Sequence, residues 1–271
     1  MNPDYVTLRP AGLPELRYIG FSGLPEFAAT ARACPAVGVS VDWAGSDFET
    51  ACARALSGDL ARVAPSDAML DKVESLLDLS GLKAVTVPAV AGGVPCVPAF
   101  LAGSPMAMRV RKRRAHERGE VVLCVEGWTS ARADSAAITR RGAAVLALAR
   151  ALSGVRPVRI VSYAASGSDR RAFFYTLPID SAPIDLARAA WVFSAPEFVR
   201  QCRFAVQRAV NGTTSQRCAG VARLLPDLLG VDSESCVVVE GLTDPRDFGS
   251  DAAAVEWIKR HLHNLADFEP V

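Results

Sequence analysis

Apolar and polar segments alternate in a regular order through the second half of the chain. From Val121 an apolar run leads to Glu126, a polar loop follows, an alanine-rich segment with an apolar stripe extends to Leu152, and a second apolar run begins at Val158. This pattern indicates a strand, a loop, a crossover helix and a strand, which is the unit that builds parallel sheets. Open α/β sheets bind ligands in the loops at the carboxyl ends of such strands, so the loop after Glu126 is the first candidate site.

The rest of the second half continues the same alternation. The short polar link between the runs 158–163 and 171–177 predicts an antiparallel hairpin, because a parallel crossover needs more residues. Gly142 lies inside the alanine-rich helix, where it is expected to allow a close approach to the sheet. The remaining expected elements are a helix opening at Asp185, a helix after Pro196, a strand over 236–240 and a helix over about 252–265.

The first half is less regular and predicts mainly helices. Ser46 is a candidate helix cap, with Glu49 three residues later completing a capping box. A short edge strand is expected between residues 84 and 90 because prolines flank it, and a Gly/Pro-rich loop follows over 91–105. The other expected helices run from Leu24 to Cys34 and from Ser66 onward.

These elements predict an α/β protein with a mostly parallel sheet flanked by helices and a mainly helical N-terminal half. We expect two regions: residues 1–119, which end in a basic segment, and residues 120–271, which hold the sheet. No internal repeat is visible.

Bulk composition adds few constraints to this prediction. The 271 residues carry a net charge of +1, and half of them are hydrophobic, so a sizeable core is expected. No run of roughly 18 apolar residues predicts a membrane span, and the polar N-terminal sequence does not resemble a secretory signal. The seven cysteines are scattered without a C-x-x-C pair, which favours reduced core thiols and a cytoplasmic location.

One charge run stands out, between Met108 and Arg118. Neutralising phosphates with such cations releases counterions, so the run suggests a nucleic-acid-associated accessory protein as one alternative. Aromatic residues are not interleaved for base stacking, and such a segment is more often a solvated linker or a protein-docking arm. The cations of the run are Arg109, Arg111, Lys112, Arg113, Arg114 and Arg118.

The order of strand, helix, strand, hairpin strand, helices, strand and helix resembles von Willebrand factor A-like domains over about residues 120–268. More narrowly, the whole chain resembles a family of uncharacterised proteins encoded by tailed bacteriophages. That second resemblance rests on VPAVAGGVPCVPAFLAGSPMAM (87–108), ITRRGAAVLALARAL (138–152) and APIDLARAAWVFSAPEFVRQCRFAV (182–206). It implies a phage or prophage origin and brings no established activity.

The von Willebrand A resemblance implies a divalent-cation site at the carboxyl edge of the sheet. The family motif is Asp-x-Ser-x-Ser after the first strand, with a further Asp-Gly pair after a later strand. Here Glu126 and Glu240 stand in place of the aspartates, Ser130 matches a hydroxyl position and Trp128 replaces a serine. Hard oxygen ligands suit Mg²⁺ or Ca²⁺, so these residues are the candidate metal ligands of a metal-dependent enzyme.

A non-enzymatic role is the main expectation. The sequence holds no Gly-x-Ser-x-Gly elbow, dinucleotide fingerprint or phosphate loop, so no catalytic residue is assigned. Trp128 is expected to be exposed in the loop beside Arg132, and Trp and Arg dominate interface hot spots. We therefore expect a phage protein-interaction module that acts in the host cytoplasm or in the virion. It would bind a protein through a rim formed by residues 126–134, 165–170 and 241–249.

Overall fold

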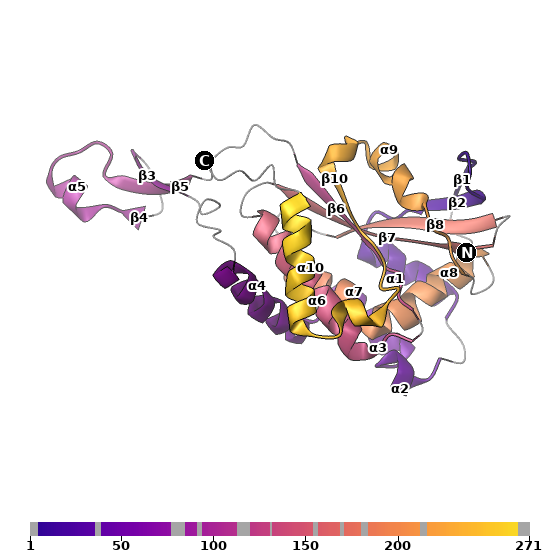
Figure 1. Cartoon of the computed structure of the whole chain (residues 1–271). Coiled ribbons are helices and arrows are strands. Elements are labelled where there is room, and N and C mark those ends of the chain that lie inside the picture. Colours follow the sequence, from indigo (N-terminus) through magenta and orange to yellow (C-terminus); the bar gives the residue numbers. More distant parts are fainter. Residues whose placement is uncertain are drawn as a thin grey trace.

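The computed structural model describes residues 5–35, 39–76, 85–90, 94–112, 120–130, 132–153, 157–168, 171–179, 184–211 and 216–264 (Figure 1). Its strands are β1 (Val6–Leu8), β2 (Glu15–Gly20), β3 (Val85–Ala89), β4 (Val94–Pro95), β5 (Met108–Lys112), β6 (Val121–Glu126), β7 (Val158–Gly167), β8 (Arg171–Ile179), β9 (Gln216–Arg217) and β10 (Cys236–Val239). Its α-helices are α1 (Leu24–Ala33), α2 (Val41–Ala44), α3 (Phe48–Ser57), α4 (Ala64–Leu76), α5 (Val97–Leu101), α6 (Ser135–Ser153), α7 (Leu186–Ser194), α8 (Arg203–Asn211), α9 (Leu225–Leu229) and α10 (Asp251–Asn264). Short 3₁₀ turns lie at η1 (Leu60–Arg62), η4 (Val221–Leu224), η5 (Ser233–Ser235) and η6 (Pro245–Phe248), and η3 (Phe198–Cys202) is a π-helical turn.

The main sheet is a mixed sheet of seven strands. Its order is β1-β2-β8-β7-β6-β10, and β9 adds to β7. The pairs β2–β8, β6–β7 and β6–β10 are parallel, whereas β1–β2, β7–β8 and β7–β9 are antiparallel. The α/β class and the β7–β8 hairpin are therefore confirmed, and the prediction of a mostly parallel sheet is wrong.

The antiparallel pairs β7–β8 and β7–β9 already make the second half of the sheet mixed, and the first half of the chain adds β1 and β2 to the same sheet. Strand β2 pairs in parallel with β8, with Tyr18 opposite Phe174, and β1 pairs with β2. Both strands are short and lie among glycines and prolines, so the hydrophobic pattern alone did not indicate them. The expected boundary at residue 119 thus separates strands that are hydrogen-bonded neighbours in one sheet.

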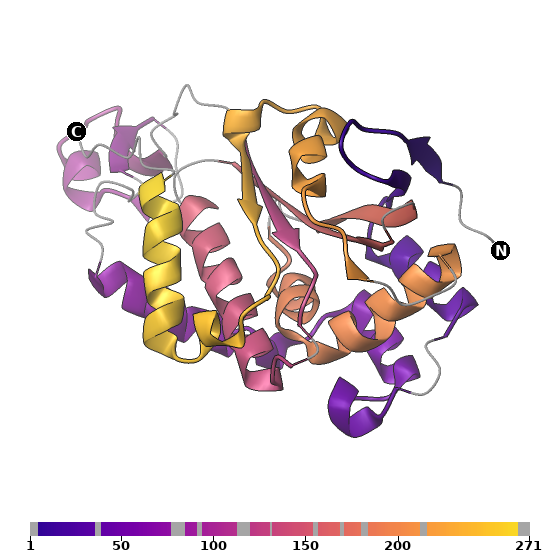
Figure 2. The ribbon, with the colours of Figure 1, turned by 45° about the vertical axis from the view of Figure 1, so that its right-hand side comes forward.

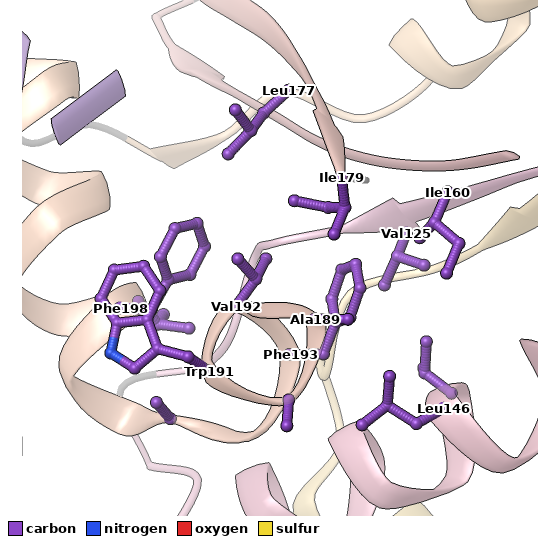
Figure 3. Packing of buried hydrophobic residues seen from close by; sticks show 14 of the residues in the cluster. Val125, Leu146, Ile160, Leu177, Ile179, Ala189, Trp191, Val192, Phe193 and Phe198 are labelled. Atoms are coloured by element: carbon purple, nitrogen blue, oxygen red, sulfur yellow. The ribbon is translucent and has the colours of Figure 1, made fainter. Parts of the chain in front are cut away.

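Helices cover the two faces of the sheet unequally (Figures 1 and 2). Residues alternate between the faces along each strand, so on β6 Leu123 and Val125 face the larger helical layer and Cys124 faces the other side. The larger layer holds α1, α3, α6, α7, α8 and α10, whereas η4 and α9 cover the opposite face. Figure 3 shows α7 side chains, including Val192 and Phe193, packed between the strands and α6.

The structure corrects two local expectations. The cap of α3 is Asp47 rather than Ser46, because the Asp47 carboxylate accepts a hydrogen bond from the Thr50 N–H at 2.8 Å. Gly142 permits close helix–helix packing rather than helix–sheet packing. A Cβ at this position would lie 2.5 Å from the carbonyl oxygen of Phe193 on α7.

A small second sheet, β3-β5-β4, stands apart from the main body together with α5 (Figure 1). Strand β5 pairs antiparallel with both neighbours, with Val110 opposite Val87 and Arg109 opposite Val94. The expected strand over 84–90 is confirmed as β3. The expected loop over 91–105 instead contains β4 and α5. We call the described part of residues 85–112 the projecting unit.

Candidate functional site

The carboxyl ends of β6 and β10 lie side by side, and the loops that follow them remain paired. The Leu242 N–H donates to the Trp128 carbonyl at 3.0 Å, and the Ser130 N–H donates to the Leu242 carbonyl at 2.8 Å. These bonds extend the parallel pairing by a bridge between Thr129 and Leu242. The predicted rim around residues 126–130 and 241–242 is therefore a closed and hydrogen-bonded edge.

Glu126 is buried at this edge as the acceptor of an ion pair. Its carboxylate receives two hydrogen bonds from Arg217 on β9, at 2.7 and 2.5 Å, and a third from the Gly241 N–H at 2.8 Å. The hydrogen bond with Glu126 is the main reason that the pKa of Arg217 is raised. A Cβ on Gly241 would lie 2.7 Å from the Trp128 carbonyl oxygen, so glycine is needed for this close approach.

This arrangement does not fit the divalent cation that the sequence resemblance implied. The guanidinium of Arg217 occupies both oxygens of Glu126 and would repel a cation. Ser130 Oγ accepts from the Arg132 N–H, and the Glu240 side chain is exposed. Among the described residues, no group of three or more His, Cys, Asp or Glu could hold a metal ion.

Arg141 of α6 joins the two strand ends from the helical layer. Its Nη2 donates to the carbonyls of Glu126 and Glu240 at 2.8 and 2.7 Å. Burial lowers the pKa of Arg141 to about 10, although the charge of Glu126 partly offsets this effect. Carbonyls at strand ends lack a further ladder partner, so a buried guanidinium satisfies them.

Trp128 and Arg132 are both placed in the loop after β6, as predicted, but their exposures differ. Arg132 is exposed, whereas Trp128 is only half-buried and not the fully exposed anchor that was expected. The Trp128 ring lies 5.0 Å from the guanidinium of Arg203 on α8, which is a cation–π contact. Trp128 therefore belongs partly to the interior of the protein.

The basic segment contributes to the projecting unit. Arg109, Arg111 and Lys112 lie on β5. Arg113, Arg114 and Arg118 fall outside the described residues, so the structure gives no account of them. Between residues 85 and 112 the sequence holds these three cations and no Asp or Glu.

The projecting unit also concentrates exposed apolar side chains. Phe100 and Leu101, at the end of α5, are 72% and 79% exposed. Val90, Val97 and Met106 are exposed as well, within the same short stretch. Scattered single apolar residues on a surface need no explanation, but a gathering of large ones commonly marks an interaction site.

Three arginines around the rim were not predicted from the sequence; Arg141 and Arg203 are buried, and Arg217 is partly buried. Arg141, Arg203 and Arg217 come from α6, α8 and β9, which are distant in sequence. One signal was available, because Arg200, Gln201 and Arg203 interrupt an apolar helical stripe in FVRQCRFAV. Arg200 and Gln201 lie in the π-helical turn η3 and Arg203 follows it in α8; all three are buried, and π turns occur frequently at functional sites.

The chain belongs to the family of a domain of unknown function, DUF7192, whose family model matches residues 16–220. The match begins in β2 and ends beyond β9, so it crosses the expected boundary at residue 119 and includes both the projecting unit and Arg203. No curated protein and no solved structure matches the chain significantly. Within the described residues, no helix has the length and apolar character needed to cross a membrane.

Proposed function

We propose that this protein is a non-enzymatic interaction module and that the projecting unit, rather than the rim, binds a protein partner. The main support for this proposal is the group of exposed apolar side chains on that unit, above all Phe100 and Leu101. Leaving such side chains in water is unfavourable by about 1.5–3 kcal/mol each relative to burial. A partner that covers them recovers this free energy.

The charge of the unit specifies the partner's chemistry. Three cations and no carboxylate accompany the apolar residues between 85 and 112. Complementary charge raises association rates and selects among partners. We therefore propose a protein surface with an apolar centre and an acidic rim.

We also propose a fold relationship, an origin and a location for this protein. The run β8-β7-β6-β10, with α6 as the crossover and β8 antiparallel to β7, supports a divergent von Willebrand A-like relationship. The segment resemblances at 87–108, 138–152 and 182–206 support a phage or prophage origin. The seven free cysteines are consistent with the host cytoplasm as the location.

A photo-crosslinking experiment tests the docking surface. A benzophenone amino acid is placed at Phe100 in one variant and at Leu60 in a control variant. Leu60 is equally suited to the label because it is 77% exposed, but it lies on η1 of the main body. We expect the Phe100 variant alone to crosslink a protein that survives nuclease treatment, and the purified pair to dissociate as salt is raised.

The other outcomes are distinguishable. Crosslinks to a second copy of the chain, with a dimer by light scattering, would replace the proposed partner by self-association. Loss of every crosslink after nuclease treatment would favour the nucleic-acid alternative based on Arg109, Arg111 and Lys112. Equal crosslinking from Leu60 would show that the projecting unit has no special role.

A further inference from the structure

Arg203 is the most deeply buried arginine of the rim region. It is the first residue of α8, and its side chain is 1% exposed. It packs in the larger helical layer, on the sheet face that also carries Tyr175 of β8 and Ser162 of β7. Its guanidinium lies 5.0 Å from the ring of Trp128 and 4.8 Å from the ring of Phe204.

Several buried polar atoms in this region have no hydrogen-bond partner among the described residues. They are Arg203 Nε and Nη1, Tyr175 Oη and Ser162 Oγ; the two hydroxyls are neighbours, and burial raises the pKa of Tyr175 although Arg203 and the Ser162 hydroxyl partly offset that rise. The two hydroxyls converge on Gly127, since a Cβ there would lie 3.2 Å from Tyr175 Oη and 3.6 Å from Ser162 Oγ. Buried polar groups are normally satisfied, so several orphans at one place indicate a missing partner.

The missing partner must also balance charge. Glu126 and Glu197 are the buried acids of the described residues, and each is paired with other arginines. Arg203 has no ion pair within the described part of the chain. Water could satisfy the orphaned donors, but only an anion can also neutralise a buried guanidinium.

We propose that a small carboxylate binds between the Arg203 guanidinium and the hydroxyls of Tyr175 and Ser162, with the Trp128 ring covering one side. The carboxylate oxygens would accept from Arg203 and from both hydroxyls, which are charge-assisted hydrogen bonds. A dianion such as phosphate is disfavoured by the charge of Glu126. Burial is the main reason that the pKa of Arg203 is lowered and that of Tyr175 is raised, but the negative charge of Glu126 is near enough to favour a higher pKa at both and would repel a second negative charge there. This site does not depend on the projecting unit.

Two sources could supply a carboxylate of this kind: a free small acid, or the acidic side chain of a protein partner. Sodium acetate serves as the probe of a free acid, and the blocked amino acid N-acetyl-aspartyl-methylamide as the probe of a side chain. Both are compared with sodium chloride and sodium phosphate at matched ionic strength.

Thermal unfolding of the full chain is the measurement. Acetate at ten times its dissociation constant is expected to raise the Tm by about 3–6 °C, in a saturable manner. Tyr175→Phe removes one orphaned hydroxyl and keeps the ring, so it should weaken the acetate response severalfold without lowering the Tm in chloride. Tyr18→Phe is the matched control: Tyr18 Oη already bonds Thr176 Oγ1 at 2.8 Å, so this variant should be less stable but respond fully to acetate.

Arg203→Met gives an independent readout. It should abolish the acetate response and, because it removes an unpaired buried charge, leave the Tm in chloride unchanged or raised. A response to the aspartyl probe as strong as that to acetate would assign the site to a partner's side chain, and a response to acetate alone would assign it to a small acid. If acetate stabilises the wild type no more than chloride, if phosphate alone stabilises it, or if Tyr175→Phe responds to acetate like the wild type, the proposal is overturned.

Discussion

At the scale of single residues, buried charge distinguishes this protein from a plain α/β core. Glu126 and Arg217 form a bidentate pair at the end of β6, and the Glu126 side chain is only 2% exposed. A buried pair adds little net stability, yet removing one partner is costly because the other charge stays buried and unpaired. Substitution of only Glu126 or only Arg217 should therefore destabilise the folded protein.

Substitution of Arg217 tests this consequence. Arg217→Met is expected to lower the free energy of unfolding by about 2–4 kcal/mol, a discounted figure because the Arg217 side chain is one-quarter exposed. The double variant Glu126→Gln/Arg217→Met should recover part of the loss. Chemical denaturation measures the free energy of unfolding of each variant. A loss in the double variant equal to the sum of the losses in Glu126→Gln and in Arg217→Met would contradict the pairing.

Gly142 provides a second test at this scale. Gly142→Ala would force a methyl group against the carbonyl of Phe193 and the hydroxyl of Ser194, so we expect a loss of about 1–3 kcal/mol despite the better helix propensity of alanine. Gly249→Ala is the matched control, because its nearest neighbour would lie 3.4 Å away. Denaturant midpoints should separate the two, and equal midpoints would argue against the tight α6–α7 contact.

At the scale of elements, hydrogen bonds within the first turn set where a helix begins. The sequence indicated Ser46 as the cap of α3, whereas in the structure Asp47 occupies this position. The hydrogen bond from the Thr50 N–H is the main reason that the pKa of Asp47 is lowered. Since the folded state holds this carboxylate ionised, the cap stabilises α3 above the unfolded pKa near 3.8, and the effect is lost as pH falls through the folded value.

The two candidate caps can be separated by alanine substitution. Asp47→Ala should lower the Tm by about 2–4 °C at pH 7, whereas Ser46→Ala should leave it nearly unchanged. The difference between Asp47→Ala and the wild type should shrink below pH 4. A larger effect from Ser46→Ala in thermal melts would restore the capping box that the sequence predicted.

At the scale of the whole molecule, one sheet unites both halves of the chain while the projecting unit stands apart. Strand β2 covers the edge of β8, and α1 and α3 pack in the same core as α7 and α8. Removing residues 1–119 would expose that edge and part of the core. The sheet region is therefore not expected to fold stably by itself.

Two truncations test this architecture. Residues 120–271 expressed alone should aggregate or lack a cooperative melt, because the β8 edge becomes unpaired. Replacement of residues 85–112 by a short Gly/Ser linker should change the Tm by no more than about 2 °C, since loop length has a small entropic cost. A cooperative melt of the isolated region 120–271 at the wild-type Tm would mean that the chain does hold two domains.

Local patterns predicted the elements well wherever they were long and regular. Strand β6 and helices α1, α6 and α10 match their expected ranges, because an apolar run or stripe of that length leaves few alternatives. The short strands β1, β2 and β9 were missed. Their few residues carry too little periodicity, and pairing with distant strands stabilises them.

The features of the fold and of the candidate site likewise fall into two groups, those determined by the sequence alone and those decided by the tertiary structure. The sequence alone determined the α/β class, the loop after Glu126 as a strand end, and the basic character of residues 109–112. Only the tertiary structure decided that β2 joins β8 in the sheet, that Arg217 pairs with Glu126, and that Arg203 is buried against Trp128. Periodicity and capping act over a few residues and can be read locally. Buried ion pairs and strand order depend on residues far apart in the sequence, so only folding brings them together: Glu126 and Arg217 are separated by 91 positions, and Tyr18 of β2 and Thr176 of β8 by 158.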